Sequence, residues 1–174
     1  MENWYAVQVR TGREESVVFQ SKSIIDRAVL NECFIPRYER MKRYHGEWHK
    51  EKHALFPGYV FFVTEKVDEL FRELKKLPEF TKILGDGMEF IPLKEKERGF
   101  LQEMADREHI IQMSEGYIVG DKVIIISGPM KEIKGEIIYV DRHKRLAVVR
   151  MEMFGRQMDV KMGVEIVSKI QAFS

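Results

Sequence analysis

Three histidines in one segment are the residues whose spacing first suggests chemistry. His45, His49 and His53 follow one another at intervals of four, which on a helix would place three imidazoles on one face as candidate metal ligands. Gly46 interrupts the run, and the neighbouring residues alternate as in a β-hairpin, where a spacing of four separates side chains by about 13 Å. Cys33 adds no paired ligand motif. We therefore interpret the three as solvated loop histidines and expect no metal and no cofactor.

Motifs for catalysis are missing from the sequence. It contains no nucleophile elbow, P-loop, GxGxxG or HExxH pattern. Gly85-Asp86-Gly87 fits a hairpin turn better than a phosphate nest. The carboxylates mostly alternate with Lys and Arg, as in residues 94–98, which is typical of a solvated helix face. We predict that the protein is not an enzyme.

Basic residues interleaved with aromatic ones offer a different chemistry. Residues 37–52 hold six basic and three acidic side chains, together with Tyr38, Tyr44 and Trp48. A projecting hairpin of this composition can meet phosphates with its cations and stack bases on its rings. A charged, solubilising edge hairpin explains the same pattern equally well.

The C-terminal residues 117–174 carry a second basic excess, with ten basic and seven acidic side chains. Lys131 and Lys134 flank one expected turn, and Arg142, His143, Lys144 and Arg145 fill another. If the strands on either side pair, these turns project from the same end of a small barrel. Solvated loop lysines are the plain alternative.

The elements that must position these side chains change character along the chain. In the first half, strand-like runs at 4–9, 33–35, 38–44 and 58–64 alternate with helical patterns at 13–25, 67–76 and 94–106, and His45-Gly46 marks a hairpin tip. We expect an α+β sandwich on one open sheet. After residue 116, five short strand-like runs (122–127, 135–140, 145–151, 157–161 and 164–167) predict a small β-barrel. The expected domains are 1–108 and 117–174, with a linker at 109–116.

Composition sets outer limits on the function. The 174 residues include 29 Lys plus Arg and 28 Asp plus Glu, so nucleic acid can be bound only through local patches. One cysteine fits a reducing compartment, and no apolar run approaches the roughly 20 residues that span a bilayer. The first residues lack a signal-peptide pattern. We expect a soluble, cytoplasmic protein.

Two sets of residues resemble the NusG family of transcription elongation factors. Trp4-Tyr5-Ala6-Val7-Gln8 and Phe56-Pro57-Gly58-Tyr59-Val60-Phe61 are similar to its N-terminal domain. Gly120-Asp121-Lys122-Val123, Ser127-Gly128-Pro129, Gly135 and Phe154-Gly155-Arg156 are similar to its KOW domain in order and spacing. Together these matches cover nearly the whole chain.

The resemblance implies a fold and a function. The fold is an α+β NusG-like sandwich followed by a five-stranded SH3-like KOW barrel, and the function is non-enzymatic transcription elongation and antitermination. The family's N-terminal domain docks on RNA polymerase, which implies polymerase contacts at Gln8, Phe56, Tyr59 and Phe61. Phe61 has the alternative of packing only its own core. Because that domain also bridges the DNA channel, we expect Arg10, Arg13, Lys42 and Arg43 to face DNA.

Departures from housekeeping members suggest a specialised paralogue resembling LoaP and, more distantly, RfaH. Met158-Asp159 stands where those members carry Thr-Pro, and Ile35-Pro36-Arg37-Tyr38 replaces a Val-Pro-Thr-Glu-like segment. We expect the barrel of a monomeric protein to contact nascent RNA or a partner such as ribosomal protein S10. The residues expected to do so are Lys131, Lys134, Arg142, His143, Lys144, Arg145, Phe154 and Arg156.

A rival hypothesis belongs to another class of function: a ribosome- or RNA-associated KOW protein with no polymerase role. Polymerase subunits among the proteins bound to the chain would discriminate between the two.

Overall fold

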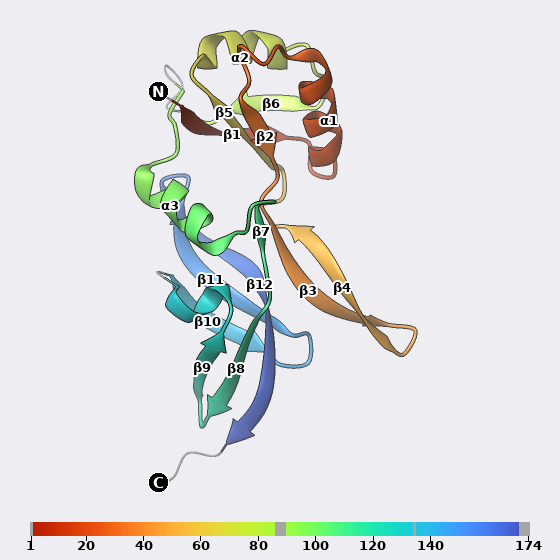
Figure 1. Ribbon diagram of the computed structural model, residues 1–174, viewed down its shortest axis with the longest axis vertical. Coiled ribbons are helices and arrows are strands. Elements are labelled where there is room, and N and C mark those ends of the chain that lie inside the picture. The colour runs from red at the N-terminus through yellow and green to blue at the C-terminus, as the bar shows by residue number, and fades with distance from the viewer. Residues whose placement is uncertain (1, 86–89, 134, 171–174) are drawn as a thin grey trace. The chain divides into compact units, whose positions relative to one another are not determined.

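Residues 2–85, 90–133 and 135–170 are described by the computed structural model (Figure 1). They divide into two units. The first contains the chain up to Pro36 together with Phe56–Gly99, and the second contains Arg37–Leu55 together with the chain from Phe100 onward. The Gly85-Asp86-Gly87 turn expected from the sequence lies largely outside the described residues.

A four-stranded antiparallel sheet forms the first unit, in the order β2-β5-β1-β6. Its strands are β1 (Asn3–Val9), β2 (Glu32–Phe34), β5 (Tyr59–Thr64) and β6 (Phe80–Ile83). Strand β5 lies between two neighbours and is buried from Val60 to Thr64, which explains its continuous apolar run.

Three helices form where the sequence predicts them: α1 (Glu14–Ile24), α2 (Val67–Leu74) and α3 (Glu95–Met104). Helices α1 and α2 carry acidic residues in the first turn, which favours the positive end of the helix dipole. Each buries a narrow stripe, Val17 and Ser21 in α1 and Leu70 and Leu74 in α2. At the start of α3, the Glu97 carboxylate accepts a hydrogen bond from the Lys94 amide at 2.9 Å.

The basic hairpin is not part of the first sheet. Strands β3 (Arg37–Tyr44) and β4 (Glu47–Ala54) pair antiparallel around the His45-Gly46 tip, as expected, and Figure 1 shows them as one long ribbon pair. Strand β3 also pairs in parallel with β7 (Ile110–Ile111), giving a separate sheet of order β4-β3-β7. The expectation of a single open sheet for the N-terminal half is therefore wrong.

A five-stranded sheet of order β10-β11-β12-β8-β9 completes the second unit. Its elements are β8 (Ser114–Val119), β9 (Lys122–Ser127), the 3-10 turn η1 (Pro129–Glu132), β10 (Glu136–Asp141), β11 (Leu146–Met153) and β12 (Arg156–Ile170). Strand β12 pairs with β11 over its first half and in parallel with β8 over its second. Fully buried side chains such as Val149, Met153 and Met162 form the core.

Two strand assignments in this region differ from expectation. The runs 157–161 and 164–167 belong to one strand, β12, because the ladder passes from β11 to β8 without a turn. The segment 109–116, expected as a linker, contains β7 and the beginning of β8. The mixture of helices and sheets confirms the α+β class.

Candidate functional site

Gln8 and Tyr59 lie side by side on the first unit. They are direct partners in the β1–β5 ladder, and both side chains are half-buried. Tyr59 begins β5 immediately after the Pro57-Gly58 turn, where Gly58 adopts a positive φ of 87° and its carbonyl accepts a hydrogen bond from the Val9 amide at 2.8 Å. The turn therefore fixes the residue pair at one end of the sheet.

Phe56 and Phe61, which were expected to contact polymerase, are buried inside the first unit. Phe56 is 2 % exposed and Phe61 is 0 % exposed. Their rings stack with centroids 5.8 Å apart, and Phe61 also lies 5.7 Å from Phe34. Phe61 points to the same face as Tyr59 by alternation, but β5 is covered on both faces and only its first residue reaches the surface. Both phenylalanines therefore act in the core, and the surface pair is Gln8 and Tyr59.

Arg10 and Arg13 are exposed on the turn between β1 and α1. The Arg10 amide donates to the Glu79 carbonyl at 3.0 Å, and the Arg13 amide donates to the Arg10 carbonyl at 2.9 Å. Gly12 between them has a φ of 91°, which an L side chain rarely adopts. The turn is thus well defined and presents both guanidinium groups to solvent.

The hairpin tip presents Lys42 and Arg43 to solvent. His45 and Gly46 both have positive φ, the geometry of a tight two-residue turn. On one face, Tyr44 stacks on His49 with centroids 3.8 Å apart and planes inclined by 11°. The aromatic ring next to the tip is therefore already partnered.

The histidines of this hairpin have structural partners. His53 is hydrogen-bonded to the Glu51 carboxylate at 2.9 Å, and this bond lowers the pKa of Glu51. His53 also stacks on Tyr38, whose pKa is raised by burial. Within the described ranges, no group of three or more His, Cys, Asp or Glu side chains is arranged to hold a metal ion.

The β10–β11 turn exposes Arg142, His143 and Lys144. The Asp141 carboxylate accepts a hydrogen bond from the Lys144 amide at 2.9 Å and closes the turn. Arg145 follows with a φ of 54° and is half-buried. A non-glycine residue with a positive φ is uncommon, so the backbone of the turn adopts a conformation at Arg145 that few residues other than glycine take up.

The other candidate residues of the barrel lie in two places. Lys131 is exposed on η1, which is anchored by a 2.9 Å hydrogen bond from the Met130 amide to the Ser114 hydroxyl. Ser114 is in register with Val164, whose amide donates to the Arg145 carbonyl at 3.1 Å, so the residue that anchors η1 and the end of the β10–β11 turn both lie against the middle of β12. Lys134 lies outside the described residues.

Phe154 and Arg156 belong to the opposite end of the β11–β12 hairpin. They flank Gly155 in the turn that follows Met153, whereas the β10–β11 turn precedes Leu146 at the other end of β11. Phe154 is half-buried and Arg156 is exposed. The seven candidate residues of the barrel that the structure describes therefore do not form one surface.

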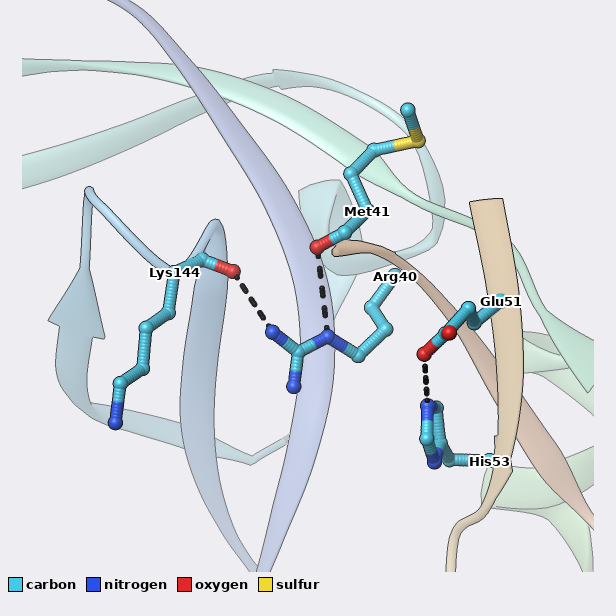
Figure 2. Close-up of polar contacts among 5 residues, drawn as sticks. All are labelled: Arg40, Met41, Glu51, His53 and Lys144. Carbon is cyan, nitrogen blue, oxygen red and sulfur yellow. Dashed lines mark hydrogen bonds and ion pairs between the residues drawn. The ribbon is translucent and has the colours of Figure 1, made fainter. Parts of the chain in front are cut away.

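Two contacts that the sequence did not predict join the hairpin to the β10–β11 turn. Arg40 donates a hydrogen bond from Nη2 to the Lys144 carbonyl at 3.3 Å, as Figure 2 shows. The guanidinium of Arg145 lies over the Trp48 ring, 3.8 Å from its centroid. Arg40 and Trp48 were visible in the sequence as part of a basic aromatic segment, but no local pattern connects residues about a hundred positions apart.

Cys33 lies on the wall of a cavity of about 380 Å³ that is also lined by Lys22, Arg27 and Glu32. Burial raises the pKa of its thiol to about 11, with Lys22 acting in the opposite direction. The group is therefore a protonated thiol at neutral pH and not a nucleophile.

Among the helices in the described part of the chain, none is long and apolar enough to cross a membrane.

The two units define a class of protein: an α/β sandwich with a surface Gln–Tyr pair, followed by a small sheet domain whose turns are basic. Residues 2–102 match the family model described as "Transcription termination factor nusG", and residues 119–152 match the "KOW motif" model. Because the first match covers more than half of the chain, the protein belongs to the NusG family.

Similar proteins agree with this assignment over almost the full length. The "Transcription termination/antitermination protein NusG" of Campylobacter jejuni is 24% identical over 171 residues, covering 96% of this chain and 97% of that protein. Its counterpart from Staphylococcus carnosus is 28% identical over 175 residues, covering 96% and 95%. A solved structure described as domain interaction in Thermotoga maritima NusG is 25% identical, covers 94% of both chains and has a TM-score of 0.55. The expected fold, a NusG N-terminal domain with a KOW domain, is confirmed.

Proposed function

We propose that this protein is a transcription elongation and antitermination factor that binds RNA polymerase through residues 1–108 and RNA or a partner protein through residues 117–174. The observation that carries the polymerase site is the Gln8–Tyr59 pair, held at the surface in direct register. Tyr59 is joined to the buried Phe56–Phe61 stack by a hydrogen bond from its amide to the Phe56 carbonyl at 3.2 Å. Tyrosines on such rigid supports are frequent hot spots of protein interfaces.

The proposed function also includes binding of DNA and nascent RNA. Arg10 and Arg13 on the first unit, and Lys42 and Arg43 on the second, are exposed cations that we assign to DNA phosphates. The cations of the β10–β11 turn and Lys131 are assigned to nascent RNA. Phe154 and Arg156, at the other end of β11, are assigned to a protein partner, with ribosomal protein S10 as the candidate.

The proposed specialisation, a paralogue resembling LoaP and more distantly RfaH, rests on the strand after Phe154-Gly155-Arg156. Asp159, at the position of the family's proline, is in register with Arg150, and the two form a bidentate ion pair at 2.9 and 3.2 Å. This pair lowers the pKa of Asp159. A charged pair in place of a proline changes the surface beside the Phe154 turn, and we infer that the set of bound partners changes with it.

A Tyr59→Ala variant tests the polymerase assignment. Loss of a hot-spot tyrosine should weaken binding to purified core RNA polymerase by at least about 2 kcal/mol, roughly 30-fold in Kd. Tyr139→Ala is the matched control, because Tyr139 is an exposed tyrosine on β10 of the second unit. Biolayer interferometry with both variants, each shown to be folded by circular dichroism, gives the comparison.

An unchanged polymerase affinity in Tyr59→Ala would contradict the assignment. No measurable binding of the unmodified protein to polymerase, together with binding to ribosomes, would favour the rival function of a ribosome-associated KOW protein.

A further inference from the structure

Two basic elements that are distant in sequence meet within the second unit. The hairpin β3–β4 supplies Arg40 and Trp48, and the β10–β11 turn supplies Lys144 and Arg145. The Arg40 hydrogen bond to the Lys144 carbonyl and the Arg145–Trp48 stack are independent contacts between the same two elements. We call these four residues the hairpin–turn cluster.

The hydrogen bonds of Arg40 within this cluster go to uncharged carbonyl groups. In Figure 2, Arg40 donates to two carbonyl oxygens, of Lys144 at 3.3 Å and of Met41 at 3.4 Å, which orient its guanidinium without neutralising it. Glu51 lies directly opposite Arg40 in the ladder; its carboxylate is hydrogen-bonded to His53, and the nearby charge of Arg40 also helps to lower the pKa of Glu51. Arg142 and Lys144 are exposed in the turn that contacts Arg40, so this turn adds two further cations to the cluster's surroundings.

The Arg145 guanidinium lies over the Trp48 ring, and this stack is the planar part of the cluster. The guanidinium lies 3.8 Å from the ring centroid, and it also forms an ion pair with Glu165, at 3.7 Å between Nη1 and Oε1. Unpaired bases of RNA stack on arginine planes and on aromatic rings, whereas bases inside a duplex are already stacked on each other. The cluster therefore fits an unpaired base between two phosphates.

Gly163 on β12 permits the hairpin to approach the barrel. A Cβ at this position would overlap the Glu39 carbonyl oxygen and would lie 3.2 Å from the Arg40 Cα. The need for glycine here comes from close approach of two backbones, since Gly163 is not among the glycines with positive φ. The cluster thus depends on a contact that a single methyl group would obstruct.

We propose that the hairpin–turn cluster is one RNA-binding site that holds an unpaired loop base of a structured RNA against the Arg145–Trp48 stack, with Arg40, Arg142 and Lys144 on the flanking phosphates. This rests on the proposed function, and it adds Arg40 and Trp48 of the hairpin to the RNA-binding residues of the β10–β11 turn. We expect the site to bind a stem-loop and not a continuous duplex, because a base that is paired and stacked inside a duplex cannot reach the cluster.

A double-mutant cycle on the full chain tests whether the two elements act together. The probe is a fluorescein-labelled RNA stem-loop with an adenine-rich loop, titrated against the unmodified protein, Trp48→Ala, Arg145→Ala and the double variant. Each single variant should lose about 5- to 150-fold in affinity, the range for one stacked base. The double variant should lose little more than the worse single one, because both remove the same stack. Fully additive losses would overturn the composite site.

Three comparison measurements sharpen the result. Lys161→Ala, an exposed cation on β12 outside the cluster, should keep the affinity within about 3-fold, since it removes at most one phosphate contact. A fully paired RNA of equal length should bind the unmodified protein more weakly than the stem-loop. Equal affinity for the duplex, or for single-stranded DNA of the loop sequence, would overturn the assignment to structured RNA.

Gly163→Ala tests the geometry without removing any charge or ring. It should displace the hairpin from β12 and weaken stem-loop binding as much as Trp48→Ala does. Gly99→Ala is the control, because a Cβ at Gly99 meets nothing within 4 Å and its backbone is helical. Circular dichroism establishes that both variants are folded. Unchanged RNA affinity in folded Gly163→Ala would overturn the proposal.

Polymerase binding, measured in parallel, separates this proposal from the function on which it rests. Gly163→Ala and Trp48→Ala leave the Gln8–Tyr59 pair intact, so polymerase affinity should persist while RNA affinity falls. If Tyr59→Ala loses polymerase binding and keeps normal RNA binding, the result supports both the polymerase site and a separate RNA site. If polymerase binding is normal, additive losses of RNA affinity in the double-mutant cycle, or no binding of the stem-loop at all, would refute only the composite site.

Discussion

Replacing Phe61 by alanine removes an aromatic ring from the centre of the first unit. Phe61 is 0 % exposed, lies in the middle of β5 and contacts the rings of Phe56 and Phe34. A buried Phe→Ala change costs about 3–5 kcal/mol, and two ring pairs that each contribute about 0.5–1.5 kcal/mol place this site in the upper part of that range. Against a total stability of about 5–15 kcal/mol, the loss is severe.

Urea unfolding measures this loss within the first unit. The chain has two tryptophans, Trp4 in the first unit and Trp48 in the second, so a Trp48→Phe background leaves Trp4 as the reporter. Trp4 is 6 % exposed and packs edge-on against Phe34 at 5.1 Å. Its emission should change when the core around Phe61 opens. The midpoint for Phe61→Ala should fall by about 1 M or more.

Phe61→Leu distinguishes a core role from a polymerase contact. Leucine keeps most of the buried volume, so this variant should be folded and should bind polymerase with nearly normal affinity. The reasoning is refuted if Phe61→Ala unfolds at the same urea concentration as the background protein while losing polymerase binding. Phe61 would then be a contact residue, as the sequence resemblance first suggested.

Two further outcomes follow from shifted pKa values. Because burial raises the pKa of Cys33 to about 11, native protein at pH 8 should react with iodoacetamide far more slowly than urea-unfolded protein, and equal rates would be inconsistent with the buried thiol. Burial opposes ionisation of Asp106, but hydrogen bonds from the Ile110 and Glu108 amides outweigh it and lower its pKa below 3.8. A lowered folded-state pKa stabilises the protein above the unfolded value, so Asp106→Asn should be less stable at pH 7, and this difference in urea midpoint should shrink as the pH falls below 3.8. A difference that grows on acidification would contradict the hydrogen-bonded carboxylate.

Local sequence patterns predicted most of the helices and strands, because short apolar runs and turn residues act locally. Strand β8 was missed because Ser114-Glu115-Gly116 reads as a polar boundary. In the structure, Ser114 is buried and bonded to η1, and Gly116 is needed because a Cβ would lie 2.6 Å from the Ile124 carbonyl oxygen. Both reasons involve residues that are distant along the chain.

The sheet to which a strand belongs was the harder prediction. The alternation in β3 predicted a hairpin correctly, but a pattern of period two says nothing about the third strand. That partner is β7, only Ile110–Ile111, which pairs with Arg37 and Tyr38. A two-residue strand carries too little pattern to be recognised in the sequence.

The docking aromatics show the same limit. Alternation correctly places Tyr59 and Phe61 on one face of β5, yet it does not tell which face is covered. All residues of β5 after Tyr59 are buried, whichever face of the sheet they point to, so both faces are covered along this part of the strand. Exposure of Tyr59 therefore results from its position at the strand end and not from its face.

The sequence suggested three hairpin aromatics for base stacking, and their neighbours in the structure give each of them a different role. Tyr38 is 6 % exposed and stacks on His53, so it holds β3 to β4. Tyr44 is 42 % exposed, but its ring is stacked on His49 at 3.8 Å. Trp48 is partnered by a cation, Arg145, which comes from the barrel and can itself stack on a base. Only at Trp48 does an aromatic ring bring a second basic element to the hairpin, and for that reason the stacking role belongs there and not at the tip.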